Sequence, residues 1–145
     1  MNSPTLKLKI TTPEKVTYEN DILQVTIPTT SGEITVLANH VPLVSVLKAG
    51  ELRIRDKNNV EELIAVAGGF LEIRGDNEVV ILADNAERAE EIDIDRAEKA
   101  RQKAVQQMEE AKSVEDVDYA KLQAIIDREM NRIKIGKKYK NIRAN

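Results

Sequence analysis

The sequence predicts an antiparallel β-sandwich in the first half of the chain, followed by a pair of α-helices. Two observations lead to this fold class. Short runs of alternating apolar and polar residues, separated by turn residues, fill the sequence up to Glu91, and a three- and four-residue apolar spacing replaces them from Asp93 onward. No helical spacing separates the predicted strands, which excludes a parallel α/β fold.

Alternating apolar residues mark the strands one after another. About eight strands at spacings of roughly 8 to 12 residues are typical of a sandwich or a flattened barrel. The segments between them carry Gly, Asn and Asp, which tolerate the positive φ that tight turns need. At Gly68 and Gly69 we expect a β-bulge. The clearest alternating runs are Leu6, Leu8 and Ile10; Leu23, Val25 and Ile27; Ile34 and Val36; Val44 and Val46; Leu52 and Ile54.

A helical hairpin is predicted after Asp93, with a break at residues 113–118 and a helix stop at Gly136. An alanine methyl buries little area, so at roughly 25 cal/mol per Å² an alanine stripe contributes far less than a leucine stripe. We therefore expect a marginally docked hairpin beside a sandwich that folds independently. The first stripe is Ala97, Ala100, Ala104, Met108 and Ala111, and the second is Leu122, Ile125, Ile126, Met130 and Ile133.

Composition limits the functional classes. The chain has 145 residues with one Phe, three Tyr and no Trp, so its core must be aliphatic. A formal net charge of -3 gives no general attraction to nucleic acid, and the absence of Cys excludes a thiolate metal site. No stretch reaches the ~18 apolar residues of a membrane span, so we expect a protein that is neither exported nor integral.

No catalytic constellation is recognisable in the sequence. His40 is the only histidine, and neither a second metal ligand at useful spacing nor a nucleophile in a recognisable setting accompanies it. Gly68 and Gly69 are not followed by the Gly-Lys-Ser/Thr of a phosphate loop. We expect no catalytic residue, no metal and no required cofactor.

Four short blocks carry a resemblance to a known family. They read TTPE at 11–14, GEITVL at 32–37 followed by Asn39 and His40, VAGG at 66–69, and ILADNAERA at 81–89. With the helices that follow, they resemble the epsilon subunit of bacterial F-type ATP synthase over essentially the whole chain. The resemblance implies a ten-stranded sandwich at residues 1–87 and a two-helix regulatory hairpin at residues 88–145.

The resemblance also implies a function and partners. Such a central-stalk subunit binds the gamma subunit and the ring of c subunits, helps to couple proton flow to ATP synthesis, and restrains ATP hydrolysis. In the inhibitory state its opened hairpin engages the alpha and beta subunits. Membrane contact then comes only through the complex, on the cytoplasmic face of the bacterial cell membrane.

Some bacterial members of that family bind ATP on the folded hairpin as a regulatory ligand. Their motif is Ile or Leu, Asp, two variable residues, Arg and Ala, and the resemblance extends to it in full at Ile92–Ala97. Arg128 and Arg132 are four residues apart on one helix face, so their two guanidinium forks can hold phosphates together. Lys103 stands where those members carry Arg, and it keeps the charge without the bidentate fork. The residues that the resemblance implies for ATP are Glu87, Ile92, Asp93, Arg96, Ala97, Lys103, Arg128 and Arg132.

Simpler structural roles compete with ligand binding at the helix start. Asp93 or Asp95 can be the helix N-cap, and the sequence from Asp95 to Glu98 has the spacing of a capping box. Capping and ligand contact are compatible at a helix N-terminus, so both remain open for Asp93.

The two arginines also have a simpler interpretation. Arg128 and Arg132 can be solvated charges, unpaired or paired with Asp127 and Glu129.

The end of the chain is strongly basic. A frayed, solvated terminus explains it, and the resemblance suggests contact with an acidic segment of the beta subunit. Nucleic acid is disfavoured because almost no aromatic residue is present for stacking. The basic residues are Arg132, Lys134, Lys137, Lys138, Lys140 and Arg143, with no Asp or Glu among them.

The sequence therefore leads to the hypothesis of a rotary-motor subunit with a mobile regulatory hairpin. The opposing hypothesis is a free-standing small-molecule-binding domain or enzyme on the same architecture. Co-purification with a gamma subunit distinguishes the two.

Overall fold

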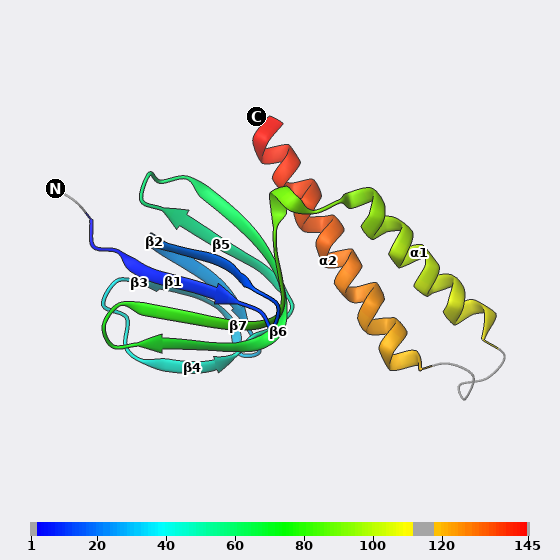
Figure 1. Cartoon of the computed structure of the whole chain (residues 1–145), viewed down its shortest axis with the longest axis horizontal. Helices are drawn as coiled ribbons and strands as arrows, with labels where there is room; N and C mark the ends of the chain where they lie inside the picture. The colour runs from blue at the N-terminus through cyan, green and yellow to red at the C-terminus, as the bar shows by residue number, and fades with distance from the viewer. Residues whose placement is uncertain (1–2, 112–117, 145) are drawn as a thin grey trace. The chain divides into compact units, whose positions relative to one another are not determined.

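A computed structural model describes residues 3–111 and 118–144 of the chain. It contains two compact units, Met1–Ala89 and Glu90–Asn145. The first is an all-β sandwich and the second a pair of helices, which confirms the predicted fold class (Figure 1). The sequence put the boundary between residues 87 and 88, and the contacts divide the chain after Ala89.

All five alternating runs from Leu6 to Ile54 lie in strands, as predicted. The strands of the described residues are β1 (Leu6–Thr11), β2 (Val16–Thr29), β3 (Gly32–Leu37), β4 (Leu43–Val46), β5 (Gly50–Asp56), β6 (Glu61–Arg74) and β7 (Glu78–Arg88). A short 3-10 helix, η1 (Ala89–Glu91), follows.

The pairing closes the sheet into a flattened barrel. The order β1-β7-β6-β5-β2 returns to its start because β1 also pairs with β2, while β3 extends from β2 and β4 from β6. The β1–β7 pairing is parallel and the others are antiparallel, so the expectation of antiparallel pairing fails at this one place. These two strands come from opposite ends of the unit, and no hairpin fixes their relative direction.

The described residues contain seven strands, fewer than the ten that the resemblance implied. Part of the difference arises because two strands of 14 residues, β2 and β6, each change partner along their length. The first half of β2 pairs with β1 and its second half with β3 and β5. In the same way β6 pairs first with β5 and then with β4.

Gly68 and Gly69 mark the point where β6 changes partner. The predicted bulge is wrong, because the register with β7 is the same on both sides: Ala67 pairs with Asn85, and Gly69 with Ala83. Both glycines instead have positive φ, +64° and +121°, and no residue is inserted into the pairing with β7.

The sandwich has its own aliphatic core, as predicted. Tyr18 is the one aromatic side chain in the core cluster. Its hydroxyl donates to Glu62 Oε2 at 2.9 Å, and burial, followed by this hydrogen bond, raises the pKa of Tyr18. The guanidinium of Arg88 lies 5.2 Å from the centre of the Tyr18 ring, and its Nε donates to the carbonyl of Thr17. The last residue of β7 is thereby fixed to β2.

The second unit consists of α1 (Ile94–Glu110) and α2 (Tyr119–Ala144). The predicted break at residues 113–118 lies outside the described residues except for Asp118, whose carboxylate accepts the amide of Lys121 at 3.0 Å. Ala104 of α1 packs with Leu122 and Ile126 of α2. Neither helix, in the part of the chain that the structure describes, has the length and apolarity needed to cross a membrane.

The predicted helix stop at Gly136 is wrong, since α2 continues to Ala144. A Cβ at Gly136 would lie 2.9 Å from Ile94 Cγ1 and 3.3 Å from Ile92 Cγ2. Glycine is therefore needed for close packing, which offsets its helix-propensity cost of about 1 kcal/mol. The start of α1 therefore lies beside the later part of α2 at Gly136, and Ala104, further along α1, lies beside Leu122 near the start of α2. The two helices are antiparallel.

Candidate functional site

Asp93 caps α1. Its Oδ1 accepts the backbone N–H of Arg96 at 3.1 Å, and its carbonyl accepts that of Ala97 at 3.0 Å. Asp93 itself has an extended backbone, as an N-cap residue does. Of the two candidate caps, Asp93 and Asp95, the structure selects the first. Its carboxylate is bound to the helix that it starts.

The remaining residues of the Ile92–Ala97 motif divide into packed and exposed members. Ile92 is buried, and Ala97 is 0% exposed. Arg96 is exposed in the first turn of α1, and Lys103 is exposed further along the same helix. The apolar members thus serve packing, while the cations of α1 remain open to solvent.

Arg128 and Arg132 converge on one carboxylate. Arg128 Nε and Nη2 each lie 3.2 Å from Glu129 Oε1, and Arg132 Nη1 lies 2.7 Å from Glu129 Oε2. The Glu129 residue is 2% exposed, whereas the side chains of Arg128 and Arg132 are 44% and 22% exposed. The structure therefore brings the two arginines together, with an internal anion between them.

Of the two carboxylates considered as partners of these arginines, Glu129 is the one that they contact. Asp127 is exposed, and its Oδ1 accepts the side-chain amide of Gln123 at 2.9 Å. The burial of Glu129 is the feature that sequence reasoning missed. One signal could have revealed it: Glu129 falls in the three- and four-residue spacing of Leu122, Ile126 and Ile133.

Glu87, the remaining residue implied for ATP, lies in β7 opposite Ala65 of β6. It belongs to the first unit, whereas the other seven implied residues belong to the second. Within the second unit, the described contacts form two groups: Asp93 with the first turn of α1, and the two arginines with Glu129.

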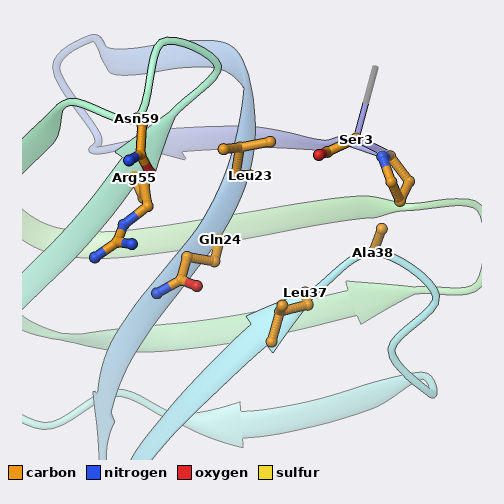
Figure 2. A pocket seen from close by; sticks show the side chains of 8 residues that line it. Ser3, Leu23, Gln24, Leu37, Ala38, Arg55 and Asn59 are labelled. Atoms are coloured by element: carbon orange, nitrogen blue, oxygen red, sulfur yellow. The ribbon is translucent and has the colours of Figure 1, made fainter. Parts of the chain in front are cut away.

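The sandwich has a hollow of about 330 Å³, shown in Figure 2. Leu37, Gln24 and Arg55 lie in one cross-strand row along it. Among the described residues, its lining contains no carboxylate and no histidine. The lining residues are Ser3, Pro4, Leu23, Gln24, Leu37, Ala38, Arg55 and Asn59.

The two units correspond to two described domains of one family. Residues 5–89 match the β-sandwich domain of the ATP synthase delta/epsilon chain, and residues 90–137 match its long α-helix domain. The chain belongs to the ATP synthase delta/epsilon chain family. The recognition made from the sequence is confirmed.

Similar curated proteins are bacterial ATP synthase epsilon chains. That of Halalkalibacterium halodurans is 37% identical over 91% of this chain and 97% of its own length. That of Desulforamulus reducens is 39% identical over 90% and 96%, and that of Ligilactobacillus salivarius is 41% identical over 91% and 95%.

Solved structures share the fold at lower identity. A chain of the Euglena gracilis mitochondrial ATP synthase (OSCP/F1/c-ring) gives a TM-score of 0.65 at 22% identity, covering 98% of this chain and 84% of that one. A chain of the Tetrahymena thermophila mitochondrial ATP synthase (central stalk/c-ring) gives a TM-score of 0.60 at 18% identity. The match covers 92% of this chain and 99% of that one. At these identities, the likeness concerns the fold.

Proposed function

We infer that this epsilon-family chain is a non-catalytic central-stalk subunit of F-type ATP synthase. Its sandwich binds the gamma subunit and the c-ring and helps to couple proton translocation to ATP synthesis. Its hairpin restrains ATP hydrolysis by opening to engage the alpha and beta subunits. The chain is peripheral, held at the cytoplasmic face of the bacterial membrane by the complex.

The observation that carries the stalk-binding role is an exposed apolar row on the sandwich. The row crosses five neighbouring strands, with one residue from each paired to the next. In order they are Val16 (β2), Thr11 (β1), Leu82 (β7), Phe70 (β6) and Val46 (β4). Its four apolar members are between 45% and 58% exposed. A contiguous apolar patch on a sheet face is typical of a protein-binding surface.

Replacing Phe70 at the centre of this row by Glu is expected to weaken binding to gamma. The substitution puts a charge into a contact that must lose its water, and loss of a central aromatic anchor of about 2 kcal/mol is roughly a thirtyfold loss of affinity. The measurement is co-purification with the gamma subunit, followed by titration of the pair.

Val60→Glu is the matched control for Phe70→Glu. Val60 is also exposed and apolar, but it lies in the turn between β5 and β6, outside the row. Retained binding in Phe70→Glu, or equal losses in the two variants, would reject this face as the gamma-binding surface.

The braking role is supported by the weak apolar contribution of α1. Its fully buried residues are two alanines, Ala97 and Ala104, whose burial contributes little, and its larger apolar side chains Ile94, Val105 and Met108 are only partly buried. A hairpin held in this way can exchange its internal contacts for contacts with a partner at small cost. ATP can shift such an equilibrium only through different affinities for the closed and open shapes, and we propose that the closed shape binds it.

Nucleotide titration of the whole chain tests the ATP site. Adding ATP is expected to move the amide resonances of Arg96, Ala97 and Arg128, because the first turn of α1 and the two arginines would surround the phosphates. AMP, which lacks two of the phosphates, should move the resonance of Arg128 less. An unchanged spectrum at millimolar ATP would remove the sensing role and leave the family assignment intact.

A further inference from the structure

Glu129 is a charged residue in an otherwise apolar seam. Leu122, Ile126, Glu129, Ile133 and Gly136 follow one another on α2 at steps of four and three, and all five are buried. Leu122 and Ile126 contact Ala104 of α1, and Gly136 lies against Ile94, so this seam faces α1 at both ends. A carboxylate in the middle of such a seam requires an explanation.

Stability does not explain it. A buried ion pair gains little over apolar side chains of similar size, because desolvation of the charges offsets their attraction. The seam already has isoleucines on both sides of Glu129, and another apolar side chain would continue the pattern. The position therefore has a carboxylate for a reason other than helix pairing.

The geometry resembles the binding of a phosphate. One guanidinium holds Oε1 and the other holds Oε2, so the carboxylate uses both arginine forks. Two guanidinium groups around one multi-oxygen anion are a common arrangement for phosphate recognition. With Glu129 in place, the three side chains carry a net charge of about +1, whereas without it they would present about +2.

We propose that Glu129 is an internal stand-in for phosphate that occupies the two-arginine site in the nucleotide-free hairpin and sets its affinity for ATP. The inference rests on the proposed ATP site and adds its regulation. A triphosphate must displace the carboxylate from Arg128 and Arg132 before it can use them. The lost ion pairs, and the buried carboxylate left behind, reduce the net affinity, so this chain responds only to high ATP concentrations.

The test is calorimetric titration of the full chain with ATP. Glu129→Gln keeps the size of the side chain and removes its charge, so the two arginines lose the carboxylate that they share. Binding is expected to tighten by about tenfold or more, the range of a hydrogen bond to a charged group. Asp127→Asn is the matched control, because it removes a neighbouring exposed carboxylate that does not hold the arginines. It should change affinity by less than about twofold.

Two further variants connect the gain to the arginines. In E129Q/R128A/R132A the gain should disappear, since both forks that Glu129 holds in the wild type are gone. Glu129→Met fills the seam with an apolar side chain of similar length and should show the same gain in affinity as E129Q. It replaces E129Q in the test if E129Q loses its helical circular dichroism signal.

The outcomes separate the two claims. If the wild type binds ATP and neither E129Q nor E129M binds it more tightly than D127N does, Glu129 is not a stand-in and the ATP site remains. If none of the folded variants binds ATP at millimolar concentration, the ATP site and this inference both fail. A tenfold gain confined to the variants that lack the carboxylate and keep the arginines supports the inference.

Discussion

Gly69→Ala is expected to destabilise the sandwich by about 3 kcal/mol or more, a large share of the 5–15 kcal/mol of a typical domain. A Cβ at this position would lie 2.0 Å from the carbonyl oxygen of Leu82 and 2.8 Å from the Cα of Ala83. Both atoms belong to the backbone of β7, so no side-chain rotation relieves the overlap. The φ of +121° is itself accessible essentially to glycine alone.

The adjacent Gly68→Ala is the control. Its Cβ would approach Asp84 Oδ2 at 2.4 Å, but this atom ends a flexible, exposed side chain that can turn away. Its φ of +64° is the left-handed region that alanine enters at a cost of roughly 1–2 kcal/mol. Urea unfolding of the full chain, followed through amide resonances of the sandwich, measures both variants. Equal stability of the two would contradict the role given to Gly69.

A disulfide between positions 94 and 136 is expected to hold the hairpin closed. A Cβ at Gly136 would be 2.9 Å from Ile94 Cγ1, an atom one bond from the Ile94 Cβ, which is compatible with the Cβ separation of about 3.5–4.5 Å in disulfides. The chain has no native cysteine to compete.

Closing a loop of roughly 40 residues gives a stabilisation of about 4 kcal/mol in the chain-entropy account. Helical circular dichroism of I94C/G136C in urea should therefore show a large difference between the oxidised and reduced forms. The single variant I94C controls for the loss of the isoleucine. A midpoint that does not change on oxidation would show that the two positions are not adjacent.

Alternation predicted where the strands are, but not how they pair. The runs at Leu6, Leu23 and Leu52 each lie in a strand, because alternation reflects one buried and one exposed face. Partner choice depends on residues far away in the sequence. For this reason Gly68 and Gly69 were expected to form a bulge, and alternation did not show that β2 and β6 each pair with different strands along their length.

Gly136 shows where local propensity fails. A glycine near the end of an apolar stripe usually marks a helix end, and that rule predicted a stop. In the structure α2 continues, because the absence of a side chain lets Ile94 pack against the helix backbone. The reason for this glycine is its contact with α1, and a rule based on local sequence does not take that helix into account.

For the candidate site, as for the strands, the sequence predicted where residues lie along an element but not which residues they contact. The motif identified Asp93 at the start of α1, and helical spacing put Arg128 and Arg132 on one face. Pairing of the two arginines with Glu129 was one of the alternatives left open, but helical spacing gave no reason to choose it for Arg128, since adjacent residues on a helix do not usually face each other. The burial of Glu129, which is 2% exposed, arises from tertiary packing, which the arginine spacing does not describe.

The moving hairpin is the central claim, and ATP hydrolysis by the assembled synthase carrying I94C/G136C tests it directly. We expect the reduced enzyme to be inhibited like the wild type. Oxidation should raise hydrolysis to the level of a complex whose epsilon chain ends at Ala89, and reductant should restore inhibition. Equal inhibition in the oxidised and reduced enzyme would contradict it, because a hairpin that cannot open would then still act as the brake.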